Sequence, residues 1–258
     1  MHNEQNHLIV TVTGPSGSGK TVLSKKLKDS GFEPLISTTT RLPRQGEVDG
    51  VDYYFLSEEQ FNRDLKNGLF MENVEYNSVL YGVSSREASR AFSMNKPAVL
   101  VAEPHGVEQI ADFCAKENWD CLRVFVNNDP RLLLGRLLNR LRTDLTGTEY
   151  GDDSLADVSL WVDRLENVRK TAPLQENFLT VLSDMTKAFG LNYSVEKINA
   201  AAQRLKSFDF EQKNWVEPAR LGGYDYLTPS FSKETEDEVI LGILKKVAPK
   251  SEPARIKL

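Results

Sequence analysis

Runs of apolar residues alternate with amphipathic stretches along most of this chain, as strands and helices do in an α/β protein. Apolar runs at residues 7–13, 97–103 and 120–126 predict strands that are buried on both faces of a parallel sheet. Shorter runs at 32–36 and 224–227 predict two further strands. Because helix-like stretches separate these runs, the pattern predicts an α/β sandwich of three layers around a parallel central sheet.

The segment between the predicted strands at 32–36 and 97–103 has a different pattern. Residues 69–76 and 79–83 predict the two strands of a hairpin. Ser57 and Gln60 have the spacing of a capping box and predict the start of a short helix. We therefore expect residues 37–87 to form a small subdomain that is inserted into the main sheet.

Helical periodicity dominates the second half of the chain. Asp129 and Pro130 predict the start of a helix with a leucine-rich stripe, and residues 171–221 predict a helical hairpin. This hairpin would enlarge the core, cover a substrate, admit a larger substrate or make a dimer contact. Ser232 predicts the cap of a final helix with acidic residues in its first turn and lysines in its last.

The composition limits the classes of function. The chain has 258 residues, 40% of them hydrophobic and 27% charged, which is typical of a globular protein. Its formal net charge of −5 argues against a general nucleic-acid binder. No apolar run approaches the roughly 20 residues of a membrane span, and the N-terminal residues lack an export pattern. Together with only two cysteines, Cys114 and Cys121, this predicts a cytoplasmic protein without disulfides.

A phosphate-binding loop follows the first predicted strand and precedes a helix. It reads Gly14-Pro15-Ser16-Gly17-Ser18-Gly19-Lys20-Thr21, which matches G-x-x-x-x-G-K-[ST] at every fixed position. The glycines allow backbone N–H groups to turn toward phosphates at the helix N-terminus. Lys20 would reach the β- and γ-phosphates, and the Thr21 hydroxyl would bind Mg²⁺. The loop predicts a nucleoside triphosphate with Mg²⁺ as one substrate.

A second informative stretch runs from residue 37 to residue 55. Arg41 and Arg44 lie three positions apart in a polar loop, and Tyr53 begins a tyrosine-rich strand. Guanidinium groups and tyrosine hydroxyls together form a surface that suits a dianion. This pattern predicts a second phosphate site.

Residues 39–55 match T-[ST]-R-x-x-R-x-x-E-x-x-G-x-x-Y-x-F without a gap, so the chain resembles the guanylate kinases. The similarity extends over residues 7–170 and over the last strand and helix. It implies a P-loop NTPase fold with a nucleoside-monophosphate-binding subdomain and a helical lid. It also implies transfer of the ATP γ-phosphoryl group to a purine (deoxy)nucleoside monophosphate, with GMP or dGMP as the expected acceptor.

The resemblance assigns roles to individual residues. The acceptor phosphate would be held by Arg41, Arg44, Tyr53 and Tyr81. The guanine base would be read by Glu72 and Ser37, because an ionised carboxylate accepts two donors side by side. Glu103, at the end of the third long strand, would contact the acceptor or a water on Mg²⁺.

Two motifs depart from the family pattern. Val83 stands where the family has Ser or Thr. In the L-D-x-D-x-Q-G motif, Val101 stands in place of the first aspartate and His105 in place of the glutamine. The phosphate end of the site is therefore expected to be intact, while the base-reading end is altered. A different or modified purine base is an open alternative.

The family's lid carries arginines that close over the transferring phosphoryl group. Arg136 and Arg140 are four residues apart and so share one side of a helix, and Arg164 is the best match to the arginine of the second lid arm. We expect these three residues and Lys20 to be catalytic.

The sequence predicts a single guanylate-kinase-like domain over residues 1–258. Its parts would be a core (7–36, 88–135 and 222–248), the acceptor subdomain (37–87), a lid (136–170), the helical insertion (171–221) and a tail (249–258). The expected partners are ATP and a nucleoside monophosphate, with no membrane and no nucleic acid, in a monomer or homodimer. A binding module without catalysis and a kinase of a polynucleotide or sugar phosphate are further alternatives.

Overall fold

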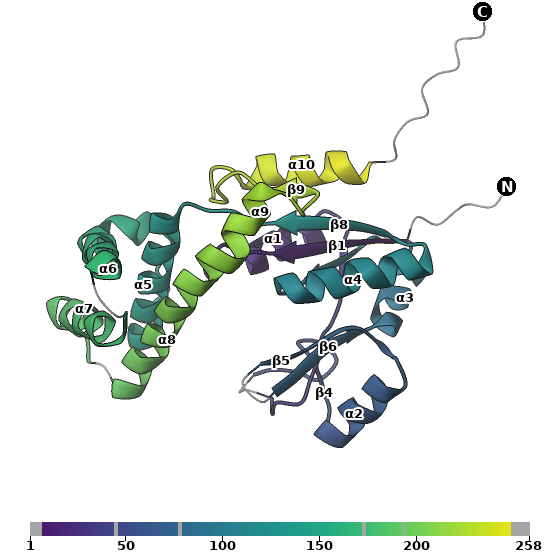
Figure 1. Ribbon diagram of the computed structural model, residues 1–258, viewed down its shortest axis with the longest axis horizontal. Coiled ribbons are helices and arrows are strands. Elements are labelled where there is room, and N and C mark those ends of the chain that lie inside the picture. Colours follow the sequence, from purple (N-terminus) through teal and green to yellow (C-terminus); the bar gives the residue numbers. More distant parts are fainter. Residues whose placement is uncertain (1–6, 44–45, 77–78, 172–173, 193, 249–258) are drawn as a thin grey trace, which may run out of the picture.

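A five-stranded parallel sheet forms the centre of the molecule (Figure 1). The structure is a computed structural model that describes residues 7–43, 46–76, 79–171, 174–192 and 194–248. The strands are β1 (Leu8–Thr13), β2 (Glu33–Pro34), β7 (Ala98–Val101), β8 (Asp120–Phe125) and β9 (Tyr226–Leu227). Their order in the sheet is β2-β7-β1-β8-β9, and every pair is parallel. The predicted parallel sheet is confirmed.

Alternating side chains of the strands divide the core into two layers. Val10 and Val12 of β1 pack with α1 (Lys20–Asp29) and α10 (Glu236–Val247), whereas Ile9 packs on the opposite face. That second face is covered by helices α3 (Ser85–Ser93) and α4 (Pro104–Glu117). Figure 1 shows α10 above the sheet and α4 below it. The three-layer arrangement is therefore as predicted.

A second, four-stranded sheet forms the inserted subdomain. Its elements are β3 (Thr38–Thr39), β4 (Tyr54–Phe55), α2 (Glu58–Lys66), β5 (Phe70–Tyr76) and β6 (Val79–Ser84), with sheet order β4-β3-β6-β5. The predicted hairpin is the antiparallel pair β5 and β6, and the capping box of Ser57 and Gln60 is present. Gln109 of α4 bonds to the backbone N and O of Asn73 in β5, which attaches the subdomain to the central layers.

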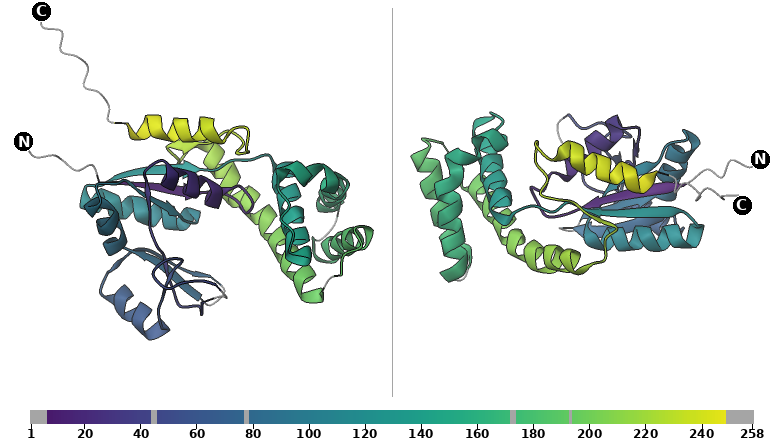
Figure 2. Two further views of the ribbon diagram at one scale, coloured as in Figure 1. Left: turned by 180° about the vertical axis from the view of Figure 1, so that it is seen from behind. Right: turned by 90° about the horizontal axis from the view of Figure 1, so that it is seen from above.

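The helices after β8 form a unit with a hydrophobic core of their own. They are α5 (Pro130–Thr146), the 3-10 helix η1 (Asp152–Val158), α6 (Ser159–Thr171), α7 (Leu174–Ala188) and α8 (Val195–Glu211). Leu138, Leu165, Leu182 and Leu205, one from each α-helix, lie in this core. Figure 2 shows these helices at one end of the molecule. The predicted lid and the predicted helical insertion thus share one core. We call these helices together the lid unit (residues 130–211).

The chain returns from α8 to the sheet through a π-helical segment, η2 (Gln212–Val216), and a short helix, α9 (Glu217–Leu221). The final helix begins at Glu236 rather than beside Ser232. The backbone N–H of Ser232 donates to Thr235 Oγ1, so residues 232–235 form a turn instead of the first helical turn. No helix within the described residues is long and apolar enough to cross a membrane.

Candidate active site

The phosphate-binding loop connects β1 to α1, as the sequence predicts. Gly19 precedes α1 with φ 94°, and a Cβ at this position would lie 2.6 Å from the ring of Phe231. Lys20 Nζ donates to the carbonyl oxygens of Gly14 at 2.8 Å and Pro15 at 3.0 Å. Burial lowers the pKa of Lys20, and the charges of Glu211 and Glu103 oppose that shift. The lysine is therefore held inside the loop, next to two carboxylates.

Asn128 fastens the loop to the segment before α10. Its Nδ2 donates to the carbonyl oxygen of Ser18 at 2.8 Å, and its Oδ1 accepts from the backbone N–H of Phe231 at 2.9 Å and from Ser230 Oγ at 3.2 Å. This buried asparagine was missed by sequence reasoning. Its position three residues after the end of β8, at the edge where parallel strands present their sites, could have indicated it.

One cavity of about 1010 Å³ is lined by the loop and, from the lid unit, by residues of α5 and η1, and we call it the lid-side cavity. Lys20, Thr21, Arg136, Arg140 and Phe231 are among the residues that line it. The predicted arginine pair on α5 is thus placed beside the loop. Because this cavity combines the helix N-terminus with two guanidinium groups, it suits the polyphosphate of a nucleotide.

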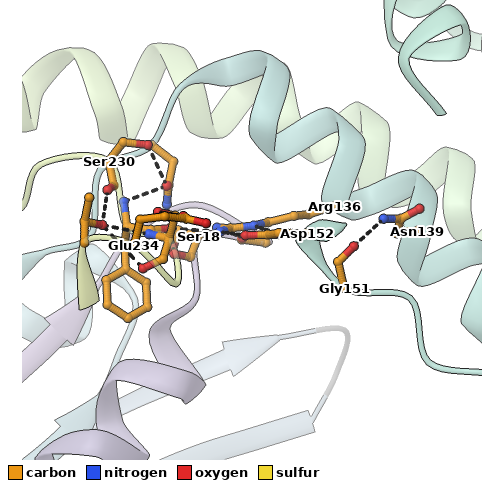
Figure 3. A network of polar contacts seen from close by, with 12 residues as sticks. Ser18, Arg136, Asn139, Gly151, Asp152, Ser230 and Glu234 are labelled. Atoms are coloured by element: carbon orange, nitrogen blue, oxygen red, sulfur yellow. Dashed lines mark hydrogen bonds and ion pairs between the residues drawn. The ribbon is translucent and has the colours of Figure 1, made fainter. Parts of the chain in front are cut away.

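Arg136 joins three elements of this cavity (Figure 3). Its Nε and Nη2 donate to Asp152 of η1 at 2.8 and 2.5 Å, its Nη1 donates to Gly17 O at 3.2 Å, and its Nη2 also donates to Phe231 O at 2.9 Å. Arg140, one turn later on α5, is exposed. The lid unit therefore contacts the loop through a side chain that the sequence predicts as catalytic.

A second cavity, of about 890 Å³, is lined by the loop, by the end of β7 and by α8, so the lid unit borders this cavity as well. Ser16 and Lys20 line both cavities, and the second is also lined by Glu103 and by Arg204 and Glu211 of α8. Sequence reasoning missed Arg204 and Glu211 as site residues. They are seven residues apart and so lie two turns apart on one helix face. This spacing is the feature of the sequence that could have indicated a shared site.

Glu211 of α8 contacts the loop directly. Its Oε2 accepts from the backbone N–H of Ser16 at 2.8 Å, and its Oε1 accepts from Ser16 Oγ at 2.9 Å. The residue is 5% exposed. A carboxylate of the lid unit is therefore buried on the phosphate loop. Its charge raises the pKa of Lys20 more than the charge of Glu103 does, and both oppose the lowering by burial.

The residues predicted to hold the acceptor phosphate gather in the subdomain. The Arg41 guanidinium lies 5.0 Å from the Tyr53 ring centroid, and the Tyr53 and Tyr81 rings are 6.3 Å apart. Arg41 Nη1 and Nη2 both donate to Glu47 at 2.6 Å, and this pairing raises the pKa of Arg41. Arg44 lies outside the described residues.

The predicted base-reading carboxylate, Glu72, is buried on β5. A Cβ at Gly106 would lie 3.1 Å from Glu72 Oε2, so the carboxylate lies against the first turn of α4. Burial, followed by the charge of Glu103, raises the pKa of Glu72 to about 7. Val83 pairs with Glu72 across the hairpin and is fully buried. Ser37 lies just before β3, where its carbonyl oxygen accepts from the Tyr54 N–H at 2.9 Å.

The structure does not bring Arg164 to either cavity. Its guanidinium on α6 pairs with Asp184 of α7 at 2.8 Å and lies 4.9 Å from the Trp161 ring. The cation from this part of the chain that does line a cavity is Arg204, which pairs with Asp144 at 2.9 Å.

The residues around the loop also fit a magnesium ion that arrives with a nucleotide. Thr21, the predicted metal ligand, is exposed on the first turn of α1 and lines the lid-side cavity. Within the described part of the chain, no group of three His, Cys, Asp or Glu side chains could hold a metal. Mg²⁺ needs no such group where substrate phosphates and water complete its coordination.

Comparison with known proteins identifies the family. The family model for guanylate kinase matches residues 5–144. The guanylate kinase of Helicobacter pylori (strain ATCC 700392 / 26695) is 33% identical over 222 residues, which are 83% of this chain and 98% of that protein. The guanylate kinase of Homo sapiens is 42% identical over 143 residues, which are 54% of this chain and 69% of that protein.

The comparison of structures agrees at the level of the fold. The crystal structure of guanylate kinase from Anaplasma phagocytophilum has a TM-score of 0.52 at 19% identity, over 94% of this chain and 87% of that one. The model match and the relatives together place the chain by sequence, and the structure supplies the matching fold. The chain belongs to the guanylate kinase family.

Proposed function

We propose that this chain transfers the γ-phosphoryl group of Mg·ATP to the phosphate of GMP or dGMP, giving ADP and the nucleoside diphosphate. The observation that carries this proposal is that Ser16 and Lys20 line both cavities. A loop between two cavities can hold a donor phosphate on one side and meet an acceptor phosphate on the other.

The lid-side cavity is the proposed donor site. Backbone N–H groups of residues 16–19 and the Lys20 ammonium would hold the β- and γ-phosphates. The Thr21 hydroxyl, with water, would hold the magnesium ion. Bound Mg²⁺ neutralises charge on the β- and γ-phosphate oxygens. Phe231 lies against Gly19 and forms part of the wall of this cavity.

The acceptor would bind between the subdomain and the second cavity. Arg41 and Arg44 with the hydroxyls of Tyr53 and Tyr81 would hold its phosphate, while Glu72 and Ser37 read the base edge. Glu103 would contact the acceptor at the end of β7. The acceptor's own phosphate oxygen attacks the γ-phosphorus and the β–γ bridging bond breaks, so the reaction needs no protein nucleophile.

The cations of the lid unit would complete the site. Arg136 and Arg140 line the donor cavity and Arg204 lines the second cavity, so closure of the lid unit would place positive charge around the transferring group. Closure also excludes water, which would otherwise accept the phosphoryl group. For Arg164, a catalytic role stays a prediction from the family pattern.

A different purine base is the second candidate, and Val83 is the observation that favours it. Its buried isopropyl group sits beside Glu72 and offers the base no hydrogen bond. Val101, 36% exposed at the end of β7, likewise lines the second cavity without a polar group. Each change would alter recognition without touching the phosphate contacts.

An acceptor panel tests the proposal. ADP release would be measured with Mg·ATP and GMP, dGMP, AMP, dAMP, dTMP or a 2-aminopurine nucleotide. We expect kcat/KM for GMP or dGMP to exceed that for the adenine nucleotides by about 100-fold or more, because a buried acceptor pair rejects bases without matching donors. Preference for another base would support the second candidate. If no acceptor in the panel leads to ADP release, both candidate functions are contradicted and a binding module is indicated.

A further inference from the structure

The chain crosses from one hydrophobic core to another just after Glu211. Phe208 is the last residue of α8 in the core of the lid unit, and Val216 lies in a separate cluster with Phe125 of the central sheet. Between them, Trp215 packs against the second cluster, while residues 209–214 belong to neither cluster. The connection between lid unit and sheet on this side is therefore about two helical turns long, and Glu211 lies within it.

Glu211 ties this connection to the phosphate loop. Both carboxylate oxygens accept hydrogen bonds from Ser16, one from the backbone N–H at 2.8 Å and one from the hydroxyl at 2.9 Å. The contact is formed between residues 195 positions apart in the sequence. With 5% of the residue exposed, the carboxylate has exchanged water for these two bonds and the nearby Lys20 charge. Removing it would take the acceptor from two donors of Ser16, a half-buried residue of the loop.

The segment that follows Glu211 is a π-helix over Gln212–Val216. π-Helical turns are rare and concentrate at functional sites, because their hydrogen-bond pattern differs from that of the flanking α-helix. The amide Nε2 of Gln212 is buried, and no hydrogen-bond partner for it lies within the described residues. Pro218, at the start of α9, has no backbone N–H and so cannot donate a helical hydrogen bond. The helical hydrogen-bond pattern is thus interrupted in this segment, which connects α8 to α9.

We infer that Glu211 is a positioning residue that couples the lid unit to the phosphate loop, with Gln212–Val216 as the joint about which the lid unit moves. The contact with Ser16 holds the C-terminal end of α8 at the loop, so the rest of the lid unit turns about this end when the joint bends. Arg204, two turns before Glu211 on the same helix, is thereby held at the second cavity. The inference rests on the proposed phosphoryl transfer, since it concerns how the lid unit responds to a nucleotide on the loop.

Kinetics of Glu211→Ala and Glu211→Gln test this role. Glu196→Ala is the matched control, because Glu196 is an exposed acidic residue on the same helix. We expect Glu211→Ala to lower kcat about 10- to 100-fold, the range of one or two charge-assisted hydrogen bonds, and to change the KM for ATP by less than about threefold. It should also raise the number of ATP molecules consumed per nucleoside diphosphate formed. Glu211→Gln should recover most of kcat, because its amide oxygen still accepts from Ser16.

Two kinetic results would overturn the inference. Glu211→Ala could match Glu196→Ala in kcat and in ATP consumed per product, which would leave Glu211 without a role in the reaction. Alternatively, it could lower the KM for ATP with kcat undiminished. That result would mean that the carboxylate competes with the nucleotide phosphates for the loop.

Hydrogen exchange provides a readout that does not depend on turnover. A non-hydrolysable ATP analogue with Mg²⁺ should slow exchange in residues 205–216 of the unchanged protein, should slow it less in Glu211→Ala, and should slow it nearly as much in Glu211→Gln as in the unchanged protein. Equal slowing in the unchanged protein and in Glu211→Ala would overturn the coupling. If the unchanged protein phosphorylates no nucleoside monophosphate, the proposed function fails, while this comparison still decides whether Glu211 couples the loop to the lid unit.

Discussion

Arg136 of α5 forms a bidentate ion pair with Asp152 of η1, with Nε 2.8 Å from Oδ1 and Nη2 2.5 Å from Oδ2. The same guanidinium donates to the carbonyl oxygens of Gly17 and Phe231. One side chain of the lid unit therefore binds the phosphate loop, the segment before α10 and a carboxylate of the lid itself. This geometry holds the guanidinium at the donor cavity before a nucleotide binds.

Arg136→Ala tests whether this preorganised cation acts in the reaction. We expect kcat to fall about 10- to 100-fold, because a guanidinium aimed at developing charge is lost from the donor cavity. Arg131→Ala on the same helix is the control, since Arg131 is half exposed and pairs only with Asp163 and Glu166 among the contacts described. Exposed pairs of this kind contribute little. Steady-state rates of ADP release that fall equally in both variants would argue against a specific role for Arg136.

Arg41→Ala tests the acceptor-phosphate site. Its guanidinium is stacked near Tyr53 and oriented by Glu47, so its loss should raise the KM for GMP about 10- to 100-fold and leave the KM for ATP within about threefold. Arg63→Ala, at an exposed position on α2 of the same subdomain, should leave both constants unchanged. A rise in the KM for ATP alone would place Arg41 on the donor side.

The ionisation of Glu72 predicts a pH dependence of acceptor binding. Burial raises its pKa to about 7, and guanine N1 and 2-amino donors need the ionised carboxylate as acceptor. The KM for GMP should therefore rise about tenfold as the pH falls from 8 to 6, because the ionised fraction falls by that factor. The KM for ATP over the same range is the internal control. A KM for GMP that does not change between pH 6 and 8 would contradict the role of Glu72 in base reading.

The same group predicts the opposite trend for folding stability. Its pKa is raised in the folded protein, so the folded state holds the proton more tightly than the unfolded chain. The resulting stabilisation is complete below about pH 4.5 and is lost as the pH rises through about 7. Glu72→Gln should therefore have a higher Tm than the unchanged protein at pH 8, and this excess should shrink toward pH 5. A Tm difference that does not vary with pH would contradict the raised pKa.

Leu182→Ala tests whether the separate core of the lid unit supports closure. Leu182 is fully buried on α7, and its truncation should destabilise the lid unit by about 2–5 kcal/mol. We expect a broader or lower calorimetric transition and a lower kcat, with more ATP hydrolysed per product. Leu160→Ala, where 61% of the residue is exposed, is the control. An unchanged kcat in a Leu182→Ala protein of lower Tm would show that lid packing does not limit the reaction.

The local parts of the site could be predicted from the sequence. The phosphate loop and the segment from Thr39 to Phe55 are continuous motifs, whose geometry depends on neighbouring residues and on the strand and helix beside them. Tyr81 was assigned only through the family resemblance, and in the structure it pairs with Thr39 of β3. Periodicity was sufficient for the sheet, the subdomain and the helices of the lid unit.

The parts that depend on long-range packing could not be predicted. Glu211 reaches Ser16 only because the lid unit folds around its own core and returns α8 to the loop. Arg164 shows the converse case, since its pattern on α6 is compatible with a lid arginine but its partner Asp184 on α7 holds it away from the cavities. The start of α10 was misplaced because Ser232 can cap a helix or begin a turn, and its bond to Thr235 decides for the turn.

The most direct test of the account is to follow the transferred phosphoryl group itself. ATP labelled at the γ-phosphate would be incubated with Mg²⁺, GMP and the protein, and the products separated. The account predicts label at the β-phosphate of GDP, at a rate that Lys20→Ala lowers about 100-fold or more. Label found only in inorganic phosphate, or an equal rate of GDP labelling with Lys20→Ala, would contradict it.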